Sequence, residues 1–259
     1  MVKVKDISKI IEKFAPKELA YSWDNTGFIT GNSEKEVKKV FITLDLFKET
    51  VDEAVKNGAD MIISHHPILF KGIKTVDYNS QQGYILKELI KNDIAVYASH
   101  TSMDCTKGGI NDVLAEKLGI NESQVIEKNE DFPDCGLGRI GKIKTSVTLR
   151  EYAEFVKKAL NTPFVRVCGD FDKKIKIVGV GGGACDDLIP DAIKMGADVF
   201  VTADMKYHIA AQSVDEKISV IDAGHYPTEA FVTEIFEKLL DGLDIEIIKS
   251  SHKDVFKFI

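Results

Sequence analysis

The sequence has few cysteines and no long apolar run, and both features limit the classes of protein to which it can belong. Its four cysteines form no Cys-x-x-Cys pair, so their spacing resembles neither a zinc finger nor a disulfide framework. No apolar run approaches the ~20 residues that a membrane helix needs. The first residues alternate charged and apolar side chains and lack the apolar core of a signal peptide. We therefore expect a cytoplasmic protein with reduced thiols and no membrane attachment.

Arginine is scarce as well, because only three of the 34 basic residues are arginine. The basic residues are scattered along a chain whose formal net charge is −7. This distribution argues against a dedicated surface for nucleic acid or for an anionic membrane, although a local basic patch stays open. The length of 259 residues is typical of one large domain or two small ones.

Histidines and carboxylates follow apolar runs at several places in the chain. The runs 61–63, 94–98 and 218–223 each read as a buried strand. The residues with metal-binding side chains that come after these runs are His65, His66, His100, Asp104, His225 and Glu229. Because the carboxyl ends of parallel strands meet at one edge of a sheet, we expect these side chains to gather.

This set is larger than one catalytic metal requires, because such a metal takes about three or four protein ligands. The set suits two divalent metals, with one carboxylate bridging them. Nitrogen and oxygen ligands fit Zn, Mn, Fe or Ni. The spacing leaves open an alternative, in which these are loop histidines satisfied by their own hydrogen bonds.

The chain also repeats itself at an offset of 138 residues. Residues 40–60 align without a gap with residues 178–198, and Gly58-Ala59-Asp60 recurs as Gly196-Ala197-Asp198. Each copy reads as strand, helix and strand. A further match, at an offset of 125, pairs the His-x-x-x-carboxylate pattern at 100–104 with that at 225–229. Two related α/β halves follow from these repeats.

Four motifs resemble the Ngg-interacting-factor-three-like family, whose members are often labelled GTP cyclohydrolase I type 2 homologues. In family order the motifs are Trp23-Asp24-Asn25-Thr26-Gly27, Ser64-His65-His66-Pro67, His100-Thr101-x-x-Asp104 and Gly224-His225-x-x-x-Glu229. The resemblance covers nearly the whole chain, which lacks the extra domain that some bacterial members carry between the halves. It implies an α/β fold of two similar, intertwined halves, a dinuclear metal site and a toroidal homohexamer. It carries over five metal ligands, with Glu229 bridging: His65, His66, Asp104, His225 and Glu229.

On this basis we predict a first half formed by residues 1–128 plus 227–259 and a second half formed by residues 129–226. The polar, acidic segment 120–135 is interpreted as the boundary between them. We expect the metal site at the carboxyl-terminal ends of the strands, in the cleft between the halves.

Three further features are candidates for catalysis or substrate binding. His100 is not a carried-over ligand, and we interpret it as a catalytic group that orients a ligand or moves a proton. The loop residues Trp23, Asp24 and Asn25 either line a substrate site or form a simple turn. Gly181, Gly182 and Gly183 lie in a G-x-G-x-x-A pattern after a predicted strand. That pattern fits a dinucleotide fingerprint, a contact to substrate phosphate, or a loop that passes close to the metals.

Two functions from different classes follow. The first is a metal-dependent hydrolase for a nucleotide-like or other small polar substrate, specifically GTP with opening of the purine imidazole ring. The second is a metal-binding regulatory or partner-binding module without turnover. Nucleic-acid binding through the hole of a ring is a third hypothesis, which the charge of −7 disfavours. A coordination position open to water or substrate would distinguish the hydrolase from the module.

Overall fold

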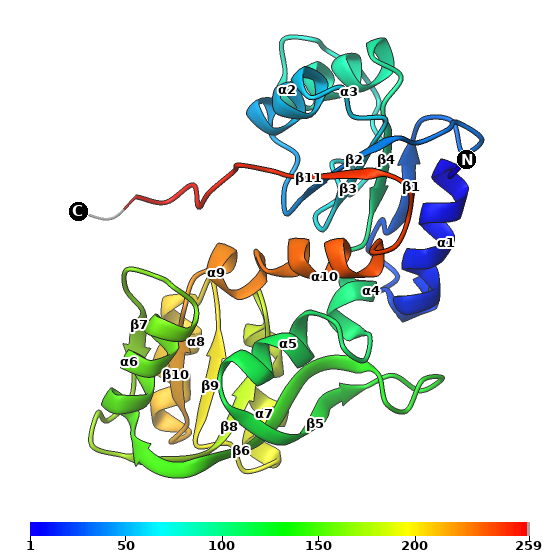
Figure 1. Ribbon diagram of the computed structural model, residues 1–259. Helices are drawn as coiled ribbons and strands as arrows, with labels where there is room; N and C mark the ends of the chain where they lie inside the picture. The colour runs from blue at the N-terminus through cyan, green and yellow to red at the C-terminus, as the bar shows by residue number, and fades with distance from the viewer. Residues whose placement is uncertain (258–259) are drawn as a thin grey trace. The chain divides into compact units, whose positions relative to one another are not determined.

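The computed structural model describes residues 1–257, which form two compact α/β units. Unit 1 comprises residues 1–103 and 232–253, and unit 2 comprises residues 104–231 together with the described residues after 253. Each unit contains one β-sheet (Figure 1). Within residues 1–257 no helix is long and apolar enough to cross a bilayer. The mixed α/β fold with two sheets agrees with the predicted fold class.

The sheet of unit 1 has five strands in the order β1-β4-β3-β2-β11. Their bounds are Gly27–Thr30 for β1, Ala95–Ala98 for β4, Met61–Ser64 for β3, Lys39–Thr43 for β2 and Glu246–Lys249 for β11. Strands β4, β3, β2 and β11 are parallel, and β1 pairs antiparallel with β4. The carboxyl ends of β2, β3 and β4 therefore lie along one edge, where the predicted histidines begin.

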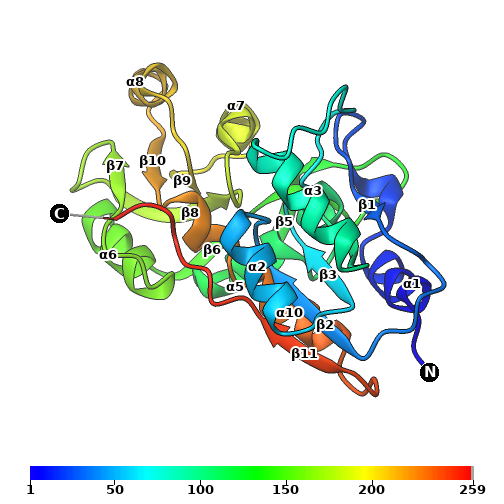
Figure 2. The same ribbon diagram turned by 90° about the horizontal axis from the view of Figure 1, so that it is seen from above.

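Helices cover both faces of this sheet. On one face, α2 (Lys48–Lys56) and α3 (Gln81–Lys91) lie side by side (Figure 2). They bury an apolar cluster that includes Phe41, Val51 and Ile62. On the other face, α1 (Val4–Phe14) contacts α10 (Val232–Leu239), and α10 packs on β2. Burial on both faces explains why β2 and β3 are nearly continuous apolar runs rather than alternating ones.

The sheet of unit 2 has six strands in the order β5-β6-β8-β9-β10-β7. Their bounds are Ile120–Lys128 for β5, Gly136–Thr148 for β6, Lys174–Val180 for β8, Val199–Thr202 for β9, Ser219–Asp222 for β10 and Arg166–Cys168 for β7. Strands β8, β9 and β10 are parallel, and the other pairings are antiparallel. The carboxyl ends of the three parallel strands again share one edge.

The helices of unit 2 also form two layers. One layer contains α7 (Ile189–Lys194) and α8 (Tyr207–Asp215), which pack on a cluster around Phe200 and Val220. The other contains α5 (Ile110–Lys117) and α6 (Leu149–Ala159), which contact β6 and β8. A short helix follows the carboxyl end of each of two strands: α4 (Thr101–Cys105) follows β4, and α9 (His225–Glu229) follows β10. Two 3₁₀ turns, η1 (Lys17–Leu19) and η2 (Asp186–Leu188), complete the described elements.

The two sheets share a topology that agrees with the predicted duplication. The order β1-β4-β3-β2 in unit 1 has its counterpart in β7-β10-β9-β8 in unit 2, and in both cases the first strand is the antiparallel edge. The register agrees as well, because Val40 pairs with Met61 and Val178 pairs with Val199, each 138 residues further on.

The repeated Gly-Ala-Asp triplets have the same structural task in both units. Asp60 Oδ2 accepts hydrogen bonds from the backbone N–H groups of residues 38 and 39, at 2.8 and 3.0 Å. Asp198 Oδ2 accepts them from residues 176 and 177, both at 2.8 Å. These donors are again 138 residues apart. Gly58 and Gly196 have φ of +67° and +82°, the left-handed conformation that ends a helix at glycine.

The halves are intertwined because each sends its last helix and strand to the other sheet. Helix α5 and strand β5 follow β4 in the chain but join the sheet of unit 2, where β5 pairs with β6. Helix α10 and strand β11 follow β10 but join unit 1, where β11 pairs with β2.

The segment interpreted as a boundary is mostly a strand. Residues 120–128 form β5, so the expected limit at 128/129 falls at the end of a strand inside unit 2, whereas the unit itself begins at residue 104. The expected limit at 226/227 falls within α9. Strand β5 was missed because it is an edge strand with mostly exposed polar side chains, a composition that protects edges but hides the apolar pattern.

Candidate metal centre

Three histidines lie together at the carboxyl edge of the unit 1 sheet. His65 and His66 follow β3 directly, and His100 follows β4, the next strand in the sheet. The ring centroids of His65 and His66 are 4.8 Å apart, and those of His65 and His100 are 5.2 Å apart. One ring nitrogen from each of the three lies within 4.8 Å of the others. This group could hold a metal ion.

An acceptor oxygen fixes the Nδ1 atom of each ring in this group. His65 Nδ1 lies 2.8 Å from the carbonyl oxygen of Ser99, and His66 Nδ1 lies 2.7 Å from Asp45 Oδ1. Because these oxygens can only accept, Nδ1 carries the hydrogen and the lone pair of the neutral ring is on Nε2. Metal-binding histidines characteristically donate their other N–H to a carboxylate or carbonyl in this way.

His100 is oriented by Asp24, which comes from the loop before β1. His100 Nδ1 lies 2.8 Å from Asp24 Oδ1, while Asp24 Oδ2 accepts from the N–H and hydroxyl of Thr101 at 3.0 and 2.6 Å. Burial would raise the pKa of Asp24, but the hydrogen bonds from His100 and Thr101 outweigh it and lower the pKa to about 2. Asp24 is therefore an ionised group that positions His100.

The predicted ligands of unit 2 lie on two short helices. His225 and Glu229 are one turn apart on α9, and His225 Nε2 is 3.0 Å from Glu229 Oε2. Asp104 belongs to α4, and one of its carboxylate oxygens lies within 4.8 Å of one from Glu229. Asp104 and Glu229 are both buried. Two carboxylates close together in a buried position favour a cation between them.

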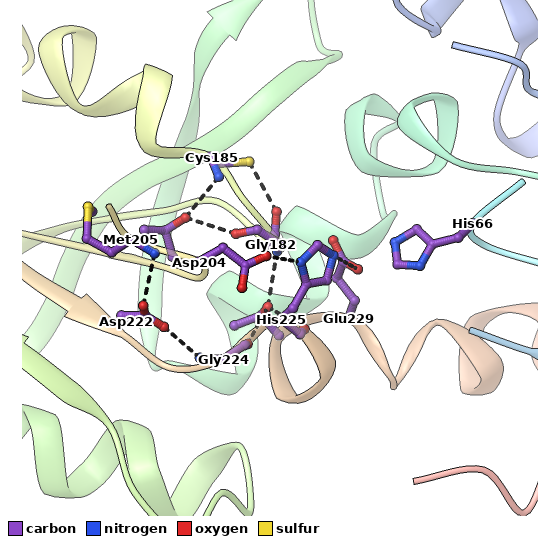
Figure 3. A network of polar contacts seen from close by, with 12 residues as sticks. His66, Gly182, Cys185, Asp204, Met205, Asp222, Gly224, His225 and Glu229 are labelled. Atoms are coloured by element: carbon purple, nitrogen blue, oxygen red, sulfur yellow. Dashed lines mark hydrogen bonds and ion pairs between the residues drawn. The ribbon is translucent and has the colours of Figure 1, made fainter. Parts of the chain in front are cut away.

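The ring of His225 lies between two carboxylates (Figure 3). On one side Nδ1 is 2.6 Å from Asp204 Oδ2, and on the other Nε2 faces Glu229. Asp222, at the end of β10, holds the adjoining backbone, because it accepts from the N–H groups of Met205 and Gly224 at 3.0 and 3.1 Å. His225 resembles His66 in that its Nδ1 is tied to an aspartate, and its Nε2 lies beside Glu229.

The glycine run after β8 leaves room for these ligands. At Gly183, which has φ of +63°, a Cβ atom would lie 2.2 Å from Glu229 Oε1 and 3.1 Å from His225 Nε2. The N–H groups of Gly182 and Gly183 donate to Asn111 Oδ1 and Thr228 Oγ1, both at 3.0 Å. The N–H of Gly181 donates to the carbonyl of Val201. Because these donors are engaged inside unit 2, we do not propose that the glycine run binds phosphate.

The predicted substrate loop divides into buried and exposed members. Asp24 is fully buried at its side chain, whereas Trp23 is 60% exposed. The Asn25 amide donates to the carbonyl oxygen of Leu69 at 2.5 Å, which ties this loop to the one after β3. Trp23 and Asn25 are both exposed residues, so of the three only Asp24 is buried at its side chain.

No cysteine belongs to the histidine and carboxylate groups described above. All four cysteines are free, and burial raises the pKa of Cys105 and of Cys185. A thiol held neutral in this way is a poor metal ligand and nucleophile. His208 lies exposed on α8, and the ring of His252 packs near Phe47. The remaining four of the six histidines are those at the strand ends.

Sequence reasoning missed the groups that orient these ligands. Asp45 and Asp204 each lie two residues after a parallel strand ends, after β2 and β9 respectively. This position could have been recognised in the sequence, because the candidate histidines also follow the ends of strands. Asn111 bridges Gly182 and the carbonyl oxygen of Asp104 at 3.0 Å from each. Its role depends on a contact between distant segments, which no local pattern reveals.

Comparison with known proteins places the chain in a family. The model of the family described as Duf34/NIF3 (NGG1p interacting factor 3) matches residues 2–255. The chain belongs to the Duf34/NIF3 family. Among curated members, a Clostridium acetobutylicum protein named "GTP cyclohydrolase 1 type 2 homolog" is 37% identical over 93% of this chain and 90% of its own length. A Clostridium perfringens protein of the same name is 34% identical over the full length of both.

Similar solved structures have the same fold. A Bacillus cereus protein described as related to NIF3 superposes with a TM-score of 0.93 at 27% identity, covering 100% of this chain and 99% of its own. The structure titled "Reduced HcgD from Methanocaldococcus jannaschii" superposes with a TM-score of 0.84 at 33% identity, covering 97% and 98%. The predicted family resemblance is confirmed.

Proposed function

We propose that this Duf34/NIF3 protein is a metal-dependent hydrolase that acts on a nucleotide-like substrate, with GTP as the specific candidate. The observation that supports the proposal is how hydrogen bonds hold the histidine rings. His65, His66 and His225 each have Nδ1 held by an oxygen of their own unit, as metal-binding histidines do, so Nε2 is the proposed ligand atom. The names of the curated relatives support the choice of GTP.

The proposed cofactor is a pair of divalent ions per chain, drawn from Zn, Mn, Fe or Ni. The proposed ligands are His65, His66, Asp104, His225 and Glu229, with Glu229 bridging. The described residues fit such ions in two respects. The donors are imidazole nitrogens and carboxylate oxygens, which suit these metals. In addition, Gly183 keeps the space beside Glu229 Oε1 clear where any Cβ would intrude.

When bound, such a metal pair activates water and stabilises the negative charge that develops in hydrolysis. The protein's own part is to hold the ligands and to move protons. Asp45 and Asp204 orient the rings of His66 and His225. His100 is oriented by an ionised Asp24, so its Nε2 is the atom that exchanges a proton with the substrate. Imidazole suits this task because it changes charge near neutral pH.

The experiment that tests the hydrolase combines metal analysis with a nucleotide panel. Protein purified without chelator should contain about two metal equivalents per chain and should release formate or phosphate from GTP. Glu229→Ala is the control for contaminating activity, and His100→Ala should lower turnover by roughly 10²-fold or more, the usual effect of losing an acid–base group. Loss of a metal equivalent in His100→Ala but not in Glu229→Ala would reverse the two roles.

The second candidate is a metal-binding regulatory or partner-binding module. It would use the same histidine and carboxylate groups to hold metal, without turnover of a substrate. Full metal occupancy without release of product from any nucleotide would favour this module over the hydrolase.

We also propose that the chain forms a homohexamer, as the family resemblance implies. Light scattering should then give about six times the chain mass of 28.7 kDa. A mass of one chain at micromolar concentration would contradict the proposal.

A further inference from the structure

Two exposed aromatic side chains, Trp23 and Phe70, lie beside the ring of His100 in unit 1. Trp23 is 60% exposed and Phe70 is 46% exposed. The centroid of Trp23 lies 5.9 Å from that of His100 at an interplanar angle of 71°, and the centroid of Phe70 lies 5.5 Å away at 81°. Two exposed aromatic side chains that gather on one histidine form a contiguous patch, and contiguous patches mark binding sites more often than single exposed residues do.

Hydrogen bonds hold the two loops that carry these rings. The Asn25 side chain donates to the carbonyl oxygen of Leu69, the residue before Phe70. The Gln82 amide donates to the carbonyl oxygen of Ile68 at 3.0 Å. On the other side, Asp24 is bound to His100 and Thr101. Hydrogen bonds therefore fix a residue next to Trp23 and a residue next to Phe70. Because both loops are already held, less conformational entropy is lost when a ligand binds.

Tyr21 already begins a stack on Trp23. The two rings are 5.8 Å apart and nearly parallel, at 13°. One face of Trp23 is thus covered by Tyr21, while the ring as a whole remains mostly exposed. A planar ligand ring on the other face would continue this stack and would remove apolar surface from water.

We propose that Trp23 and Phe70 form an aromatic rim beside His100 that binds the planar heteroaromatic ring of a small molecule, a nucleobase in chemical class. This inference deepens the proposed function, because it names the part of the substrate that the protein recognises. The loop between β3 and α3 that carries Phe70 also carries Lys71 and Lys74, against one acidic residue, Asp77. A ligand ring with a phosphate attached would therefore meet positive charge there.

The chain supplies its own reporter for this site, because Trp23 is its only tryptophan. The test titrates the metal-loaded full-length protein with guanosine, with GMP and with ribose 5-phosphate, and follows tryptophan fluorescence. Guanosine and GMP should change the emission with saturation, whereas ribose 5-phosphate should not. Formate is assayed in the same samples, because GMP retains the imidazole ring that the proposed reaction opens.

The matched variants are Phe70→Leu and Phe155→Leu. Phe155 is 42% exposed on α6, close to the exposure of Phe70, and it belongs to unit 2. Phe70→Leu should weaken GMP binding at least about fivefold, the lower end of what one base–aromatic contact contributes. Phe155→Leu should bind like the wild type. Calorimetry with GMP gives the same comparison for Trp23→Leu, which lacks the reporter.

Three outcomes would overturn the proposal. They are no response to GMP by metal-loaded protein, an equal affinity in Phe70→Leu, and a fall in oligomeric mass in Phe70→Leu without loss of GMP binding. The last would assign the rim to a contact between copies of the chain. Saturable binding of GMP by a protein that turns over no nucleotide would refute the hydrolase and leave the aromatic rim standing. A variant such as Glu229→Ala that loses metal but still binds guanosine supports the rim independently.

Discussion

Gly183 sets how closely the main chain can approach the carboxylate of Glu229. Its φ of +63° lies in the left-handed region, and a Cβ atom at this position would fall 2.2 Å from Glu229 Oε1. Gly196 offers a comparison within the same unit, because it has φ of +82° but nothing within 4 Å of its Cβ position. Backbone strain is therefore common to both glycines, and crowding of a proposed ligand belongs to Gly183 alone.

We predict that Gly183→Ala loses at least one metal equivalent, whereas Gly196→Ala keeps its full metal content. Both variants should lose about 1–2 kcal/mol of unfolding free energy from the left-handed backbone. Elemental analysis gives the metal content, and urea unfolding gives the stability. Equal metal content in the two variants would mean that Glu229 does not bind metal in the position that the structure gives it.

Asp24 makes stability depend on pH in the acid range. The pKa of its carboxyl group is about 2 in the folded chain, against 3.8 for the ordinary group. A lowered pKa stabilises the folded state above the unfolded value, and this contribution is lost as the pH falls from about 4 to about 2. With allowance for partial solvent screening, we expect about 1–2 kcal/mol.

The measurement compares Asp24→Asn with the wild type by urea unfolding across this range. The variant should be less stable by that amount at pH 6, and the difference should shrink below pH 4. A difference that stays constant down to pH 2 would show that Asp24 acts through shape and not through its charge.

At this scale the sequence singled out residues that the structure brings together within each unit, but not the groups that orient them. His65, His66 and His100 do share one sheet edge, and Asp104, His225 and Glu229 lie in one unit. Asp24 was predicted in the substrate loop, but it is a buried partner of His100. Local pattern could not assign it, because the hydrogen bond joins residues 76 positions apart.

Among the elements, the strand–helix–strand repeat is held by a pair of equivalent aspartates. Asp198 Oδ2 accepts from the backbone N–H groups of residues 176 and 177, at the start of β8. Asp60 does the same for residues 38 and 39 at the start of β2. Each carboxylate thus satisfies backbone donors where a strand enters the sheet, which explains why the Gly-Ala-Asp triplet occurs in both halves.

We predict that Asp198→Ala lowers the unfolding free energy by about 1–3 kcal/mol, because it leaves two backbone donors without this acceptor. Asp191→Ala is the control, since Asp191 makes only an exposed ion pair with Lys194 on α7. Such pairs contribute at most about 0.5 kcal/mol. Urea unfolding at pH 7 measures both. Similar losses in the two variants would remove the structural reason given for the repeated triplet.

Elements with apolar periodicity were predictable, and those at the edges were not. The strands expected at 61–63 and 94–98 occur as β3 and β4, within a residue of their predicted ends. The edge strand β5 was not predicted, because its mostly exposed polar side chains lie in the segment 120–135 that was interpreted as a boundary.

For the molecule as a whole, the exchange of α5–β5 and α10–β11 between the sheets has a consequence for folding. The sheet of unit 1 is not complete until the chain has passed through unit 2, because β11 joins it from beyond residue 240. The proposed ligands also come from distant parts of the sequence, because they extend from His65 to Glu229. An unfolded chain therefore cannot assemble them, and a metal that binds them stabilises only the folded state.

This linkage gives a prediction about thermal stability. A site filled at a free metal concentration of 100 Kd adds about 2.7 kcal/mol, and in a chain of this size each kcal/mol raises Tm by roughly 2–4 °C. We therefore expect protein stripped with chelator to melt about 5–10 °C lower, for each site filled, than protein in Mn²⁺ or Zn²⁺. His65→Ala combined with His66→Ala should lose part of this gain. His208→Ala should keep all of it, because His208 is an exposed histidine on α8. Differential scanning calorimetry, with and without chelator, measures the three proteins under matched conditions. If the double variant gained as much from metal as the wild type, the ions that stabilise the chain would bind somewhere other than the strand ends of unit 1.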